Sequence, residues 1–237
     1  MTSFALAIEN ELDREAEQIT IRGHYFTDAG VKYLAKHLPK DCPCKVLSLD
    51  DCSLGAKGGA ALGSQVLPKV RALQGLFLSS NDLTDHGLKH LAGHLNTVGR
   101  LRTIRIDSNS IGDPGAVALF RALPGTDITT VGVSNNHIAD GGAKALARSL
   151  PGCKFLATVN LNRNRITNGG ARHIALAIPH SASNDTIDLG LNLITEKGER
   201  ALRIAREKQS RERKIRATFD KLDGERDTPV ARVMQMT

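Results

Sequence analysis

Three cysteines and a nearby histidine in the first quarter of the chain are the residues whose types could hold a metal ion. Cys42, Cys44 and Cys52 lie close together in the sequence, and His37 precedes them. Thiolate sulfur and imidazole nitrogen are ligands that Zn²⁺ prefers. Their spacing matches no zinc-binding pattern, and a repeat described below accounts for Cys44 and Cys52. We therefore expect no metal site. Four cysteines in 237 residues are also too few for a disulfide framework, which favours a reducing compartment.

A second group of residues that could do chemistry is formed by His86, His90 and His94, which fall on one helical face at i, i+4 and i+8. They could bind a metal adventitiously or respond to pH, but a solvated face is the simpler explanation. The sequence contains no HExxH, GxSxG or P-loop pattern, and no GxGxxG followed by a helix and an acidic residue. These observations predict a protein that is not an enzyme, with no catalytic residues and no cofactor.

The strongest signal is a pattern that recurs every 27 to 29 residues. Residues 73–87 read LQGLFLSSNDLTDHG, residues 101–115 read LRTIRIDSNSIGDPG, and residues 156–170 read LATVNLNRNRITNGG. Weaker copies begin at positions 16, 44, 128 and 184. A glycine follows six residues after the asparagine position of each copy, and that position is occupied in turn by His24, Cys52, Asn81, Asn109, Asn136, Asn164 and Asn192. A fixed period of this length is typical of a solenoid.

Each part of the pattern has a physical reason. Alternating apolar residues such as Ile104 and Ile106 predict a short strand with one buried face. The asparagine amide can satisfy backbone groups that a buried turn leaves unpaired. The glycine allows either a close approach of two backbones or a positive φ. Apolar residues three and four positions apart then predict a helix, for example over 116–123.

Strand, loop and helix units of about 28 residues resemble the ribonuclease-inhibitor class of leucine-rich repeats, and the resemblance covers residues 16–206. It implies an α/β fold, a curved solenoid or horseshoe of about seven repeats with parallel strands on the concave side and helices on the convex side. The class also includes the repeats of NOD-like receptors and of the activator of the GTPase Ran.

The ends of a solenoid need caps, and the sequence suggests a division into three parts. Residues 1–15 are expected to form a capping helix, with Ser3 as N-cap and Phe4, Ile8 and Leu12 on one face. Residues 16–206 form the solenoid. Residues 207–237 continue the last helix, which begins near Glu196, to about Phe219 and end in a flexible tail.

The concave strand face is where this architecture usually binds a partner. Phe77 is an aromatic residue at a strand position facing outward in a chain with only 3% aromatic residues, and aromatic and arginine side chains are enriched among interface hot spots. The alternative is that Phe77 is a tolerated surface residue. The candidate partner-binding residues are Phe77, Arg105, Asp50, Asp107, Arg163 and Asn160.

The formal net charge of +7 is concentrated near the C-terminus, where residues 197–216 carry nine Lys or Arg against three Glu. This helix can be read as a solvated cap, as a surface for an acidic protein, or as a patch for nucleic acid or an anionic membrane. Its apolar stripe is sparse, and no segment is apolar enough to span a membrane.

The first functional hypothesis is a monomeric cytoplasmic module that binds a protein ligand on its concave face. A protein of this kind can also be a bacterial effector delivered into a host cytosol. One alternative is a regulator of a small GTPase, which the resemblance to the Ran activator allows, although that family ends in an acidic tail and this chain in a basic one. The other is a nucleic-acid or anionic-surface adaptor acting through the basic helix.

Overall fold

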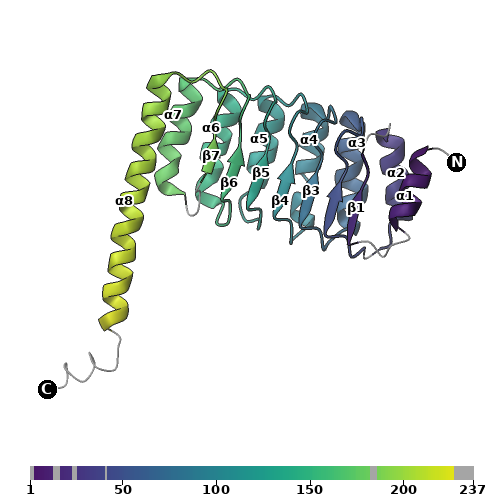
Figure 1. The fold of residues 1–237 in the computed structure, drawn as a ribbon, viewed down its shortest axis with the longest axis horizontal. Helices are drawn as coiled ribbons and strands as arrows, with labels where there is room; N and C mark the ends of the chain where they lie inside the picture. The colour runs from purple at the N-terminus through teal and green to yellow at the C-terminus, as the bar shows by residue number, and fades with distance from the viewer. Residues whose placement is uncertain (1–2, 13–16, 23–25, 41, 182–185, 227–237) are drawn as a thin grey trace.

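A computed structural model shows a solenoid in which strands and helices alternate along the whole chain (Figure 1). The structure describes residues 3–12, 17–22, 26–40, 42–181 and 186–226. Within them, one parallel sheet runs in sequence order from β1 to β7 and is not closed. Its strands are β1 (Gln18–Thr20), β2 (Val46–Ser48), β3 (Gly75–Phe77), β4 (Thr103–Arg105), β5 (Thr130–Gly132), β6 (Thr158–Asn160) and β7 (Thr186–Asp188). The predicted α/β leucine-rich-repeat solenoid is confirmed.

The helices lie side by side along the other face of the molecule (Figure 1). They are α1 (Ser3–Leu12), α2 (Thr27–His37), α3 (Gly55–Ala61), α4 (Thr84–Ala92), α5 (Asp113–Ala122), α6 (Asp140–Ser149), α7 (Asn168–Ala177) and α8 (Glu196–Arg226). Short 3-10 or π turns extend several of them, namely η1 (Leu62–Val66), η2 (Leu67–Lys69), η3 (Leu95–Thr97), η4 (Leu150–Gly152) and η5 (Ile178–His180).

The strands pair in step, each residue opposite the one that occupies the same place in the next repeat. Ile104, for example, pairs with Leu76 on one side and Val131 on the other. These residues and Ile106 are completely buried between the sheet and the helices. Because each such side chain contributes about 1.5–3 kcal/mol when buried, a slip of one residue, which would turn the apolar set outward, is strongly disfavoured.

The repeat glycines are explained by close approach and not by positive φ. A Cβ atom on Gly87 would lie 2.9 Å from the carbonyl oxygen of Ala56 and 3.0 Å from its Cα in the neighbouring helix. On Gly142 it would lie 2.5 Å from Ile138 Cγ2 and 3.0 Å from Ala116 Cβ. Neither glycine has a positive φ. Each repeat therefore has a glycine at the position where the first turns of adjacent helices are in contact.

At the N-terminal end, α1 packs against α2 and β1. Ile8 is buried and Leu12 partly buried in the core, while the side chain of Phe4 and residues 13–15 lie outside the described part. At the other end, α8 runs without interruption across position 206 and reaches Arg226, which is longer than expected from the sequence (Figure 1). The tail expected after it falls on residues 227–237, outside the described residues, as does His24. No described helix is long and apolar enough to cross a bilayer.

Candidate functional site

Three columns of side chains run across the concave face. They come from the first residue of each strand, from its third residue, and from the second residue after the strand. The first column becomes a row of threonines toward the C-terminus and reads Gln18, Val46, Gly75, Thr103, Thr130, Thr158 and Thr186. The second reads Thr20, Ser48, Phe77, Arg105, Gly132, Asn160 and Asp188, and the third Arg22, Asp50, Ser79, Asp107, Ser134, Asn162 and Gly190. Most of these residues are small and polar, so the side chains of Phe77 and Arg105 are larger than those around them.

The ring of Phe77 is half-buried because it folds back along its own strand over Gly75. A Cβ atom on Gly75 would lie only 2.8 Å from Phe77 Cε2, so a side chain at this position would push the ring away. Part of the Phe77 side chain remains exposed. The glycine two residues before the phenylalanine therefore determines how the aromatic side chain is presented.

Arg105 lies opposite Phe77 in the adjacent strand and is held by Asp107. Arg105 Nε donates to Asp107 Oδ2 over 3.2 Å, with 52% of the arginine side chain exposed and 12% of the aspartate. The next strand has Gly132 at this level, and a Cβ atom there would lie 3.3 Å from Arg105 Cγ. Gly75 and Gly132 thus leave space on both sides of the Phe77 and Arg105 pair.

Asp50 and Asp107 are engaged within the sheet itself. Asp107 Oδ1 accepts hydrogen bonds from the N–H and the hydroxyl of Ser134, both at 2.7 Å. Asp50 Oδ1 accepts from Ser79 N–H at 2.7 Å, and its Oδ2 accepts from the Ser48 hydroxyl at 3.1 Å. Both carboxylates brace one strand against the next, and Asp107 in addition orients Arg105.

Asn160 and Arg163 do not join this cluster. Both belong to the repeat of β6, three strands away from β3, which corresponds to about 14 Å at the usual strand spacing. Asn160 Oδ1 accepts a hydrogen bond from Asn162 N–H at 3.0 Å, whereas the Arg163 side chain is exposed. The six candidates therefore form one pair with two supporting aspartates, and two further residues that lie apart from it.

Arg163 occupies a left-handed backbone position that recurs in every repeat from the second onward. The residues there, which precede the asparagine ladder, have φ between 52° and 58° and are Asp51, Ser80, Ser108, Asn135, Arg163 and Leu191. Aspartate and asparagine tolerate this conformation best, so the short polar side chains in most copies were a usable signal. Arg163 and Leu191 are exceptions and project from the rim.

Each asparagine of the ladder bridges two neighbouring repeats. Asn109 Oδ1 accepts from the N–H groups of Asn81 and Leu83 at 3.2 and 3.1 Å, and Nδ2 donates to the carbonyls of Leu78 and Asp107. Asn81, Asn136, Asn164 and Asn192 make corresponding bonds. In the copy with a cysteine, Cys52 Sγ donates to the Ile21 carbonyl at 3.2 Å.

A second ladder, which we did not predict from the sequence, connects the first turns of successive helices. Asp113 Oδ1 accepts from the N–H groups of Ala139 and Gly142 at 2.7 and 2.9 Å. Asp85 and Asp140 accept the corresponding pair of N–H groups in the repeat that follows each of them, whereas Asn168 accepts only the N–H of Thr195. Carboxylates suit this place because helix N-termini offer free N–H groups and a positive dipole. The signal was an Asp or Asn two residues before the repeat glycine.

The pKa of Asp140 reflects this environment. Partial burial acts to raise the pKa, but hydrogen bonds from the Thr167 hydroxyl and N–H and from the Gly170 N–H outweigh it and lower the pKa below 3.8. The ladder carboxylate is thereby stabilised in its ionised form.

The residues considered for metal binding are scattered or buried separately. Cys42, Cys44, Cys52 and Cys153 are all buried, and none of them forms a disulfide in the described part of the chain. His86 and His90 pack with their ring centroids 4.7 Å apart, and His94 Nδ1 lies 3.0 Å from the His90 carbonyl. In the described part of the chain, no three His, Cys, Asp or Glu side chains are arranged to hold a metal ion.

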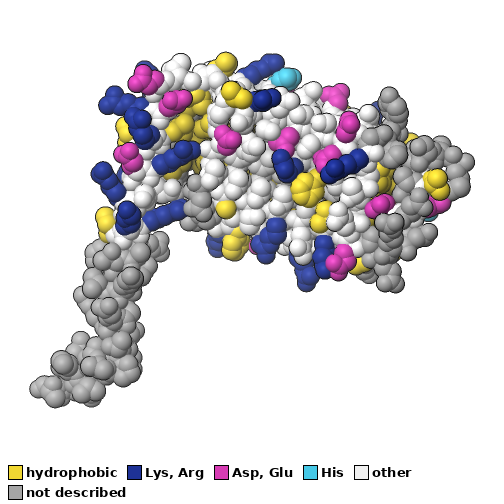
Figure 2. Space-filling view, in the orientation of Figure 1, with side chains coloured by type: hydrophobic (Ala, Val, Ile, Leu, Met, Phe, Trp, Pro, Cys, Tyr) yellow, Lys and Arg dark blue, Asp and Glu magenta, His cyan; other side chains and the backbone are white. Residues whose placement is uncertain are grey.

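The charged residues predicted at the C-terminus are displayed along α8. Lys and Arg side chains gather at this end of the molecule (Figure 2). Lys197, Arg200, Lys208 and Arg211 are all exposed, and the last buried side chain of the described part of α8 is Gln209, whose Nε2 donates to the Ile178 carbonyl at 2.7 Å. Beyond Gln209 the described side chains of α8 are fully turned to solvent.

A comparison with protein families agrees with this architecture. A sequence model of the family described as Leucine Rich repeat matches residues 101–120, 126–147 and 152–175. Among solved structures, the chain is similar to one titled Leiomodin-1 Actin-Binding Site 2, with 14% identity, a TM-score of 0.48, and coverage of 58% of this chain and 80% of that one. No curated protein matches the sequence. Three of the repeats in the chain therefore match leucine-rich repeats in sequence, and the open parallel sheet with its flanking helices has the fold of a leucine-rich-repeat solenoid.

Proposed function

We propose that the protein is a non-enzymatic interaction module that binds a protein ligand on its concave face, with Phe77 and Arg105 as the central contacts. The observation that carries this proposal is their adjacency. They pair across β3 and β4, stand above a face of small polar residues, and are flanked by Gly75 and Gly132. Aromatic and arginine side chains are enriched in protein interfaces, and arginine also among the residues that contribute most to binding.

The other candidates receive supporting roles in the proposal. Asp107 orients the guanidinium of Arg105, and Asp50 braces β2 against β3. Arg163, with Asn160 below it, provides a second contact for a ligand that extends along the concave face toward β6. We further propose that the protein acts as a monomer, and that it works in a reducing compartment, since none of its four cysteines forms a disulfide among the described residues.

A quantitative pull-down tests the concave site. Wild type is compared with a Phe77→Ala, Arg105→Ala double variant and with a matched control, Phe155→Ala with Arg148→Ala, which removes an exposed phenylalanine and an exposed arginine away from the strands. Proteins retained by the control and lost by the double variant support the proposal, and their dissociation constant should rise by at least about tenfold in the double variant. Retention of all ligands by the double variant would reject the site.

A second candidate function is supported by the exposed basic side chains of α8, which could bind an acidic protein, nucleic acid or an anionic surface. Replacing Arg200, Lys208 and Arg211 by glutamine tests it. Phosphate binding should weaken steeply with ionic strength and weaken further in this variant. Binding that is independent of salt excludes the nucleic-acid form of this hypothesis.

A further inference from the structure

The sheet ends at β7 with its hydrogen-bonding pattern incomplete. In the six preceding repeats, the N–H of the residue just after the strand donates to a carbonyl of the next strand, as Val133 does to Asn160 at 2.9 Å and Leu161 to Asp188 at 2.8 Å. The N–H two residues later does the same in five repeats, as in the bond of Arg163 to Gly190 at 2.9 Å. Leu189 and Leu191 occupy these positions in the last repeat. Within the described residues their N–H groups meet no following strand.

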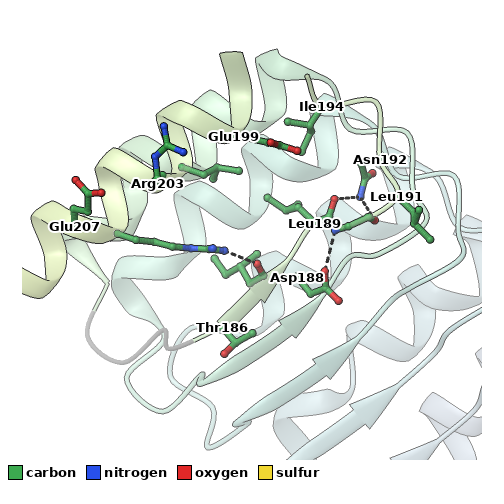
Figure 3. A pocket seen from close by; sticks show the side chains of 13 residues that line it. Thr186, Asp188, Leu189, Leu191, Asn192, Ile194, Glu199, Arg203 and Glu207 are labelled. Atoms are coloured by element: carbon green, nitrogen blue, oxygen red, sulfur yellow. Dashed lines mark hydrogen bonds between the residues drawn. The ribbon is translucent and has the colours of Figure 1, made fainter. Parts of the chain in front are cut away.

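A hollow lies between this free edge and α8, and we call it the end groove (Figure 3). It encloses about 730 Å³ and is lined by Ile187, Leu189 and Leu202 together with Arg203, Arg206 and Glu207. The Arg206 guanidinium crosses the groove and donates to the Ile187 carbonyl at 2.8 Å. The floor of the end groove is therefore formed by core residues of the last repeat. In every earlier repeat, the corresponding residues are covered by the repeat that follows.

The rim of the end groove is apolar where other repeats are polar. Leu191 and Leu193 are 69% and 62% exposed. The corresponding residues of the five preceding repeats are Asp51, Ser80, Ser108, Asn135 and Arg163 for the first position, and Ser53, Asp82, Ser110, His137 and Arg165 for the second. Only the last repeat places leucine at both, and Leu191 also lines the end groove.

We propose that the end groove binds an extended segment of a partner polypeptide, which pairs with β7 as an eighth strand and takes the Ile187 carbonyl from Arg206. Donors two residues apart along a strand edge require acceptors with the same spacing, which an extended backbone provides. A helix cannot provide them, because its carbonyls are already bonded internally. Alternate apolar side chains of the segment pack on Leu189 and Leu202 inside the groove, and the other side of the segment contacts Leu191.

The probe is a capped synthetic peptide with the sequence of residues 156–165, LATVNLNRNR, since this segment fills the equivalent edge of β5 within the protein. In that pairing, the Asn160 carbonyl accepts from Val133, so in a parallel ladder the Asn160 N–H also faces β5 while that of Val159 faces away. N-methylation at the peptide's Asn160 should weaken binding by at least about tenfold. N-methylation at Val159 is the matched control and should leave binding within about twofold.

Protein variants test the location. Leu191→Asp with Leu193→Asp should weaken peptide binding by at least about tenfold, whereas Leu176→Asp, an equally exposed leucine on α7, should not. Bound peptide should also slow hydrogen exchange of the Leu189 amide. The Phe77→Ala, Arg105→Ala double variant should bind the peptide normally, which separates this site from the concave one.

Three outcomes would overturn the proposal. The first is an absence of saturable binding up to about 1 mM peptide, and the second is equal binding of both N-methylated peptides. The third is protection of the Leu189 amide in the free protein. If that protection disappears on deletion of residues 227–237, the chain's own tail occupies the groove, and if it disappears on dilution, a second copy does. The N-methylated peptides keep the test valid even if a protein variant fails to fold.

Discussion

The Arg206 guanidinium donates a 2.8 Å hydrogen bond to the carbonyl oxygen of Ile187 at the C-terminal edge of the sheet. A comparable contact exists at the opposite edge, where Glu11 of α1 accepts a 3.2 Å hydrogen bond from the N–H of Thr20. A terminal helix thus supplies one charged side chain to one backbone group at each end. Neither contact replaces a whole strand, so both edges are only partly satisfied.

The capping role of Arg206 predicts a local effect. Arg206→Met keeps much of the apolar stem but removes the donor, and should destabilise the protein by about 0.5–1.5 kcal/mol. Arg203→Met, one turn away on the same helix, is the control and should change stability by less than about 0.5 kcal/mol. Urea unfolding measures both, and equal effects of the two substitutions would contradict the assigned role.

Loss of a ladder amide should be far more costly than loss of a surface amide. Asn109→Ala leaves the buried N–H groups of Asn81 and Leu83 without an acceptor, and we expect a loss of about 2–4 kcal/mol. Asn135→Gly removes only an exposed bond to the Ser108 hydroxyl, because glycine accepts the left-handed φ of 52° at this position, and should cost less than about 0.5 kcal/mol. Denaturant midpoints compare the two variants, and similar midpoints would show that the ladder is dispensable.

The repeat glycine should resist even a single methyl group. Gly87→Ala brings its Cβ against the backbone of Ala56, so α3 and α4 must separate, at a cost of about 1–3 kcal/mol. At Gly99 a Cβ has no heavy atom within 4 Å, and Gly99→Ala should be neutral or slightly stabilising. Thermal unfolding of both proteins checks this, and an unchanged midpoint for Gly87→Ala would mean that the helix contact is not tight.

The stability contributed by Asp140 should depend on pH in the acidic range. Its pKa in the folded protein lies below the ordinary 3.8, so its contribution is fully present above pH 3.8 and is lost as the pH falls through the folded value. The stability difference between wild type and Asp140→Asn should therefore shrink on acidification below about pH 3.8. Urea unfolding from pH 7 down to pH 3 measures it. A difference that grows in acid would reverse the assigned sign.

The buried thiols should be chemically silent in the folded protein. Burial raises the pKa of Cys44 to about 12, with a further contribution from Cys42, and burial raises that of Cys153 to about 11. Because the thiolate is the reactive form, iodoacetamide at pH 8 should leave both unmodified in the native protein and alkylate them in denaturant. Mass spectrometry of the intact protein reads the result, and rapid alkylation of either thiol in the native state would exclude this burial.

Much of the fold could be predicted from the sequence because its information is periodic. The spacing of Asn81, Asn109, Asn136, Asn164 and Asn192, with a glycine six residues after each, already required stacked coils, since every repeat meets only its neighbours. Alternation such as Ile104 and Ile106 fixed which strand face is buried, and so which residues, Phe77 and Arg105 among them, face outward.

Only the tertiary structure decided which polar groups bond to each other between repeats and at the two ends of the solenoid. Nothing local to Asp107 or Asp50 shows that their carboxylates bond to the following strand, because the partner lies about 28 residues away and is reached only after stacking. The helix-terminal bonds of Asp113 are likewise set by the neighbouring coil, and the edge at Leu189 by the lack of a further strand among the described residues. Periodic burial can be read one repeat at a time, whereas the partners of polar groups depend on how the repeats are placed against each other.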